Sequence, residues 1–177
     1  MPYRRKQAVQ CPVLDEFDIA KDLKTSGSVS ILAPSGAGKT TFLRRLIYQS
    51  NPKRVMGFPG SRKSAADMKR YIPPCWLIES KSDDTWTPEL QQRMQDAFDG
   101  QTRLTALRDQ IHREYPHLKV SNQLCTITDD YGDDELAVKS PLMKKNRTKG
   151  RNNEMLDINV FQVFLILSLV LAFTCDV

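Results

Sequence analysis

The chain has 177 residues, 40% of them hydrophobic and 27% charged, which suits one domain with a buried core and disfavours two independent domains. A formal net charge of +5 favours an anionic partner, nucleic acid or nucleotide, without indicating specificity. The four cysteines stand singly with no Cys-x-x-Cys pair, so the sequence encodes neither a zinc nor a redox motif and favours reduced, intracellular thiols.

The first elements lead into a glycine-rich loop. Residues 1–24 mix basic, acidic and apolar positions without the apolar segment of a secretory signal, and we expect them to form an amino-terminal extension. Residues 29–32 then form an apolar run that predicts a short buried strand. From Lys39 onward, apolar residues fall at helical spacing up to the Asn51-Pro52 pair, which predicts a helix packed against a sheet.

Two elements are expected in the middle of the chain. The apolar segment 75–80 follows a double proline and is predicted to be the second strand. Thr87 followed by Pro88 is typical of a helix start. Helical spacing extends this helix to about Tyr115, despite the glycine at position 100.

The last segments complete an alternating pattern. Residues 123–130 are predicted to form a strand that ends in acids, residues 139–151 a basic polar segment, and the apolar run from residue 157 a further strand. Strands that alternate with helices predict an α/β domain with a mainly parallel sheet. We place this domain at residues 25–167 and an apolar tail at residues 168–177.

The loop APSGAGKT, residues 33–40, fits the phosphate-binding pattern G-x-x-x-x-G-K-[ST], with Ala33 in place of the first glycine. Its glycines permit backbone N–H groups to converge on one anion, and the following helix adds its positive end. Lys39 is predicted to reach the β and γ phosphates of ATP, and the Thr40 hydroxyl to bind Mg²⁺. The predicted nucleotide-binding residues are Pro34, Ser35, Gly36, Ala37, Gly38, Lys39, Thr40 and Thr41.

An acidic pair at the end of the strand 123–130 is the candidate second half of this site. Asp129 is predicted to hold Mg²⁺ from its outer shell, and Asp130 to polarise the water that attacks the γ-phosphate. The alternative is that both belong to the solvated acidic loop that continues to Glu135.

Two groups of basic residues have several interpretations. Segment 139–151 contains six basic residues and no acid, which indicates a solvated loop, a contact with DNA phosphates, or an arginine that reaches ATP on a neighbouring subunit. Arg147 and Arg151 are the candidates for that arginine. The other group is a candidate DNA-facing surface or a plain exposed face, and consists of Arg54, Arg62, Lys63, Lys69 and Arg70.

Together these segments resemble the DNA-packaging ATPases of large DNA viruses, the poxvirus-type branch of the FtsK–HerA superfamily of P-loop motors. The resemblance covers about residues 28–155 and is carried by SILAPSGAGKTTFLRRLI, YIPPCWLIES, TITDDYGDDE and TKGRNN. It implies a P-loop NTPase three-layer sandwich with ATP and Mg²⁺ as cofactors. It also implies catalytic roles for Lys39, Asp130 and Arg151, although Asn152 stands where the family's Gly-Arg-His segment has histidine.

The same resemblance implies a biological setting. The chain would be one subunit of a homo-oligomeric ring that hydrolyses ATP to move double-stranded DNA into viral capsids, with capsid or portal components as partners. Its place would be the host cell cytoplasm or nucleus at sites of virus assembly, or the virion.

The carboxyl terminus departs from the family, whose members carry a glutamine sensor at the tip of the last strand and continue beyond it. Gln162 comes too early for that sensor, and we expect a sandwich that is incomplete at its carboxyl terminus. Three alternatives stay open: a P-loop nucleoside or nucleotide kinase, a truncated nucleotide-binding protein without activity, or a protein anchored in a membrane by residues 158–175.

Overall fold

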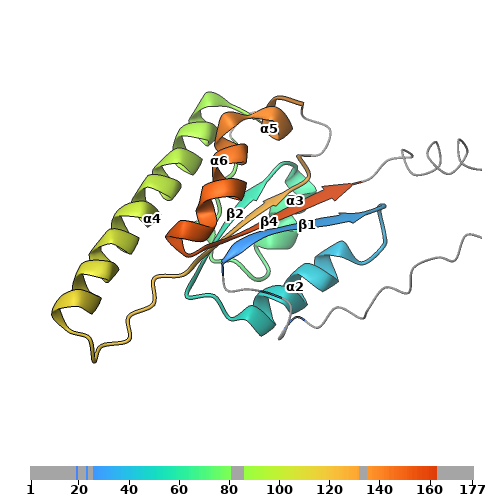
Figure 1. Ribbon diagram of the computed structural model, residues 1–177. Coiled ribbons are helices and arrows are strands. Elements are labelled where there is room, and N and C mark those ends of the chain that lie inside the picture. The colour runs from blue at the N-terminus through green and yellow to red at the C-terminus, as the bar shows by residue number, and fades with distance from the viewer. Residues whose placement is uncertain (1–18, 20–22, 24–25, 81–85, 132–134, 163–177) are drawn as a thin grey trace, which may run out of the picture.

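The computed structural model describes residues 19, 23, 26–80, 86–131 and 135–162, which form a parallel sheet covered by helices (Figure 1). The four strands lie in the order β1-β4-β3-β2. Because neighbouring strands are all parallel, their carboxyl ends meet at one edge of the sheet. The strands are β1 (Gly27–Ala33), β2 (Arg54–Pro59), β3 (Leu124–Asp129) and β4 (Met155–Gln162).

Helices cover both faces of the sheet, which confirms the α/β class with three layers (Figure 1). One face packs against α2 (Lys39–Ser50) and α3 (Arg62–Met68), through a core that includes Leu46 and Ile158. The other face packs against α4 (Pro88–Glu114), α5 (Glu135–Lys139) and α6 (Pro141–Lys149).

The strands β3 and β4 carry a buried polar network on the face toward α6. Thr126 Oγ1 donates to Asp157 Oδ1 at 2.9 Å, and Thr128 Oγ1 donates to Asn159 Oδ1 at 2.8 Å. The Asn159 amide also donates to Asp157 Oδ2 at 2.8 Å. These bonds explain how a central strand tolerates threonines, because each buried polar group has a partner.

Segment 75–80 is not the second strand, which is a correction to the sequence prediction. Pro74–Trp76 forms a short 3₁₀ helix, η1, and Leu77 makes an isolated bridge to Gly57 of β2. Pro74 starts η1, whose turn includes Cys75 and Trp76, and the pairing of this segment with β2 is limited to the bridge at Leu77. The strand position belongs instead to β2, which pairs with β3 from Arg54↔Leu124 to Pro59↔Asp129.

Of the interpretations for residues 139–151, the solvated loop is wrong, because most of these residues form α6. Ser140 caps this helix by accepting a hydrogen bond from the Met143 N–H at 3.1 Å, and Pro141 occupies its first turn. A short 3₁₀ helix, η2 (Gly150–Asn153), then leads into β4.

Other predicted elements are confirmed. The helix after the loop is α2, and α4 continues through Gly100 to Glu114. The strand at 29–32 is β1, but the prediction that it is buried is wrong, because β1 lies at the edge of the sheet and its residues are partly or fully exposed. Thr87 caps α4 by accepting from the Leu90 N–H at 3.2 Å.

Several predictions for the two ends of the chain fall outside the described residues. These are the apolar tail and the amino-terminal extension apart from Ile19 and Leu23, which lie in or against the core. Of the proposed anchor at 158–175, residues 158–162 form the end of β4, and Ile158 and Val160 lie in the core. In the described part of the chain, no helix has the length and apolarity that crossing a membrane requires.

Candidate nucleotide-binding site

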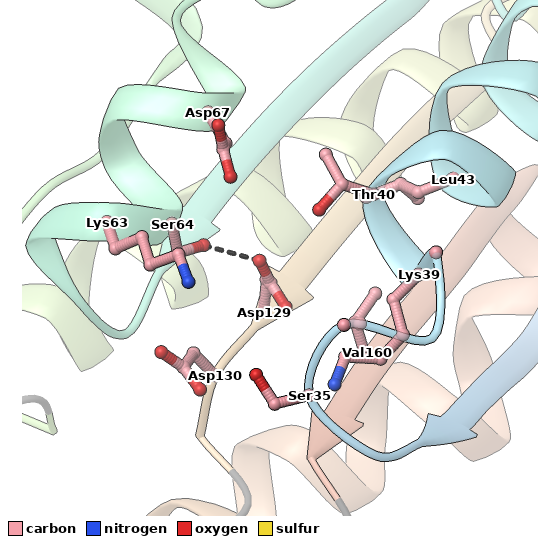
Figure 2. A pocket seen from close by; sticks show the side chains of 12 residues that line it. Ser35, Lys39, Thr40, Leu43, Lys63, Ser64, Asp67, Asp129, Asp130 and Val160 are labelled. Carbon is pink, nitrogen blue, oxygen red and sulfur yellow. Dashed lines mark hydrogen bonds between the residues drawn. The ribbon is translucent and has the colours of Figure 1, made fainter.

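A cavity of about 290 Å³ lies at the carboxyl edge of the sheet (Figure 2). The phosphate loop and the start of α2 form one wall, the end of β3 forms the floor, and α3 forms the opposite wall. The edge where parallel strands end is the usual place for a ligand in open α/β sheets.

The phosphate loop has the backbone that its glycines predict. Gly36 has φ 78° and Gly38 has φ 85°, a left-handed backbone conformation that residues other than glycine rarely adopt. Gly38 is also the N-cap of α2 and provides no side-chain cap, so the first N–H groups of that helix are left for a ligand. Such a helix start favours a phosphate.

Lys39 folds back over the loop. Its Nζ donates to the carbonyl oxygen of Ala33 at 2.8 Å and to that of Pro34 at 3.4 Å. A phosphate oxygen is a charged and therefore stronger acceptor than a carbonyl, so a nucleotide would compete for this ammonium group. The predicted position of Lys39 at the cavity is therefore consistent with phosphate binding.

The remaining loop residues divide into two sets. Ser35 and Thr40 line the cavity together with the two glycines, and the Thr40 hydroxyl faces Asp129 across it (Figure 2). Pro34, Ala37 and Thr41 lie in the same loop and first helical turn but outside the cavity lining, so their contact with a nucleotide stays a prediction.

Asp129, at the end of β3, lies at the centre of the floor. Its Oδ2 accepts a hydrogen bond from Ser64 Oγ at 2.5 Å. Burial raises the pKa of this carboxyl, and the charge of Asp130 adds to the rise, whereas the Ser64 hydrogen bond and the charge of Lys39 oppose it. The hydrogen bond and the lysine therefore favour the ionised form that a cation needs.

Asp130 follows in a strained conformation, with φ 70°. Its N–H donates to the Val160 carbonyl at 3.2 Å, which fixes the turn against β4. Gly60 packs so closely behind this turn that a Cβ there would lie 2.5 Å from the Asp130 carbonyl oxygen. Strain held in place by such packing is typical of functional sites.

The wall formed by α3 was not anticipated from the sequence. Lys63, Ser64 and Asp67 all line the cavity from this helix (Figure 2). Lys63 was predicted only as part of a basic surface. The signal that was present is Ser61, whose Oγ accepts from the Ser64 N–H at 3.1 Å and so caps the helix.

The protein oxygen atoms at this site are suited to bind Mg²⁺ that is already coordinated by a nucleotide. Thr40 and Asp129 offer a hydroxyl and a carboxylate, the hard ligands that Mg²⁺ prefers. Within the described residues, no group of three acidic, histidine or cysteine side chains could hold a metal ion without help. A magnesium site made of one or two protein oxygens, phosphate oxygens and water agrees with this arrangement.

The candidate arginines lie away from the cavity. Arg151 is exposed on η2, at the amino edge of the sheet, so its catalytic role stays a prediction that requires a neighbouring subunit. The Arg147 guanidinium lies 3.5 Å from Asn159 Oδ1 and 5.6 Å from the centre of the Phe161 ring. Arg147 therefore makes its contacts within its own fold.

Arg54 is not part of a DNA-facing surface, which corrects one member of the first basic group. Its guanidinium donates to Gln101 Oε1 at 2.5 Å and to the Asn122 carbonyl at 2.8 Å. Both partners are at the amino edge of the sheet, where Arg54 connects β2 to α4. Lys69 and Arg70 are exposed and pair with Glu79 and Asp67, respectively.

No protein-family model and no curated protein matches the chain. Among solved structures, it is similar to the cytoplasmic domain of the Thermomonospora curvata type VII secretion ATPase EccC, with a TM-score of 0.50 and 18% identity over 84% of this chain and 20% of that one. The pCW3 conjugation coupling protein TcpA, solved as a monomer form with ATPγS, matches with a TM-score of 0.47 and 14% identity over 81% of this chain and 44% of that one. This chain thus spans less than half of either protein. The likeness to EccC shows that the fold is that of a P-loop ATPase domain.

Proposed function

We propose that this chain is a P-loop ATPase of the FtsK–HerA type, which couples Mg²⁺-dependent hydrolysis of ATP to the movement of double-stranded DNA. The observation that carries the proposal is the convergence of Lys39 and Thr40 with Asp129 and Asp130 on one cavity (Figure 2). The P-loop ATPase fold supports it.

The residues have separate tasks in this mechanism. The N–H groups of the loop and of the α2 start bind the phosphates, and the Lys39 ammonium moves from the loop carbonyls to the terminal phosphates. Thr40 and Asp129 would hold Mg²⁺, and the ion would supply positive charge that stabilises the phosphates during hydrolysis. Asp130 orients the attacking water and accepts its proton.

The finer proposal is that the movement packages viral DNA. Its support is the family resemblance of the four sequence segments together with the exposed basic residues Lys144, Lys149 and Arg151 on α6 and η2. These side chains suit contacts with the DNA backbone that do not depend on sequence. The work would be done by a ring of identical subunits acting with capsid or portal components, inside the infected cell or in the virion.

The test is release of phosphate from ATP by the full chain, with Mg²⁺ and with or without double-stranded DNA. We expect turnover that DNA stimulates and that Lys39→Ala lowers by about 10²-fold or more. Lys119→Ala, at an exposed lysine outside the cavity lining, is the matched control and should keep the turnover measured without DNA. Transfer of the phosphate to an added nucleoside would identify a kinase instead, and full turnover by Lys39→Ala would contradict the assignment.

A further inference from the structure

The hydrogen bond between Ser64 and Asp129 joins α3 to the floor of the cavity (Figure 2). The two residues are 65 positions apart in sequence, and their oxygens are 2.5 Å apart. Ser64 is buried, with 6% of its surface exposed, so water does not replace this contact easily.

The segment that carries Ser64 holds Asp129 at two points. The Gly60 N–H donates to the Asp129 backbone carbonyl at 2.7 Å, and Ser64 Oγ donates to its carboxylate. Ser61 begins α3 between these two contacts. Backbone and side chain of Asp129 are therefore positioned by the same five residues, 60–64.

Without Ser64, the Asp129 carboxylate would lack a fixed orientation. Two other carboxylates, those of Asp67 and Asp130, line the same cavity. The Ser64 bond involves Oδ2, so Oδ1 stays outside that bond, at the cavity that Thr40 also lines.

We propose that Ser64 is a positioning residue that presents the Asp129 carboxylate to the hydrated Mg²⁺ of a bound nucleotide. This inference rests on the nucleotide-binding function proposed above. Partners of metal-binding side chains typically change metal affinity by about 10- to 100-fold when they are removed. Ser64 should therefore affect the Mg²⁺ dependence of nucleotide binding, and not the binding of nucleotide alone.

The experiment is a titration of Mg²⁺ into the full chain with a fluorescent ATP analogue, followed by fluorescence anisotropy. We expect Ser64→Ala to raise the Mg²⁺ concentration at half-saturation by about tenfold and to leave the affinity without Mg²⁺ unchanged. Ser64→Thr keeps the hydroxyl and should behave like the wild type. Ser61→Ala removes the cap of α3 but not the bond to Asp129, and should also keep the wild-type half-saturation.

The outcomes separate the two proposals. Wild-type Mg²⁺ dependence in Ser64→Ala, or an equal shift in Ser61→Ala, would overturn the role of Ser64. Absence of any saturable binding by the wild type would overturn the nucleotide-binding function itself. If Ser64→Ala does not fold, the pair Ser64→Thr and Ser64→Val, similar in shape and different in the hydroxyl, makes the same comparison.

Discussion

At the amino edge of the sheet polar side chains bond to one another, whereas at the carboxyl edge they face a cavity. Gln101, buried in α4, donates to the carbonyls of Asn122 at 2.9 Å and Asn153 at 2.7 Å, and accepts from Arg54. Close by, Arg108 bonds to Asp109 and to Glu154. The carboxyl edge instead brings acids and lysines together around about 290 Å³ of open space.

This difference distinguishes polar side chains that stabilise the fold from polar side chains that are available to a ligand. Buried polar groups that form hydrogen bonds with one another stabilise the fold. When one partner is removed, the other stays buried without a hydrogen bond, which lowers the free energy of unfolding. Charged groups of both signs gathered around open space are typical of a functional site. Substitutions at the amino edge should therefore lower stability, and substitutions at the carboxyl edge should lower activity.

The largest effect is expected from Asp130→Asn at the carboxyl edge. Asparagine tolerates the left-handed φ of 70° and keeps the shape of the side chain, so the variant removes only the charge. We expect ATP turnover to fall by about 10²-fold or more because the attacking water loses its proton acceptor. Nucleotide affinity and melting temperature should stay near wild type. Normal steady-state turnover would show that another residue orients the water.

The next effect is expected from Gln101→Leu at the amino edge. This change removes three hydrogen bonds at once, those of Gln101 with Arg54, with the Asn122 carbonyl and with the Asn153 carbonyl, and should lower the free energy of unfolding by about 2–3 kcal/mol. Urea denaturation measures it. Gln110→Leu, on the exposed face of the same helix, is the control and should stay within about 0.5 kcal/mol. Equal stability of both variants would refute a structural role for this network.

A smaller effect at the carboxyl edge is expected from Gly60→Ala. The added Cβ would lie 2.5 Å from the Asp130 carbonyl oxygen, so the turn that carries Asp130 must shift. We expect the free energy of unfolding to fall by about 1–3 kcal/mol and ATP turnover to decrease. Gly100→Ala meets no atom within 4 Å in the middle of α4 and should stabilise the protein by up to about 1 kcal/mol. If Gly60→Ala and Gly100→Ala change the free energy of unfolding equally, the close packing of Gly60 against the Asp130 turn is not what limits stability there.

The smallest effect concerns pH and the buried Asp157 beneath α6. Burial raises the pKa of this carboxyl, and hydrogen bonds from Asn159 and Thr126 oppose the rise. Asp157 therefore keeps its proton to higher pH in the folded state than in the unfolded chain, where the carboxyl has a pKa of about 3.9. The free energy of unfolding should therefore fall as pH rises from there through the folded pKa.

Asp157→Asn carries no such proton and should lose this part of the pH dependence. Urea denaturation of both proteins between pH 4 and pH 8 should show the wild type losing stability relative to the variant as pH rises. Asp129 contributes equally to both proteins and cancels in the difference. Parallel curves would mean that Asp157 is ionised throughout, held by Arg147 and its other partners.

The phosphate loop, α2 and the acidic end of β3 were predictable because their signals are local. Glycines before Lys39, and an apolar run before Asp129, specify their structure within a few residues. The strand β2 was not predictable, because its six residues include a glycine and a proline, which are uncommon inside strands. Its pairing with β3 also joins residues that are far apart in sequence, such as Arg54 and Leu124.

The second wall of the cavity was unpredictable for a related reason. With seven residues, α3 is too short for a helical period to stand out, and the contact of Ser64 with Asp129 spans 65 positions. The helix α6 carried a Ser-Pro start signal, but its polar composition suggested a loop.

The most direct test of the account is equilibrium binding of a fluorescent ATP analogue, with Mg²⁺, to the wild type, Lys39→Ala and Gln101→Leu. The account predicts saturable binding that Lys39→Ala weakens by about tenfold or more without a change in melting temperature. Gln101→Leu should lower the melting temperature and keep the affinity of the folded protein. Undiminished binding by Lys39→Ala would contradict the claim that the cavity at the carboxyl edge is the nucleotide site.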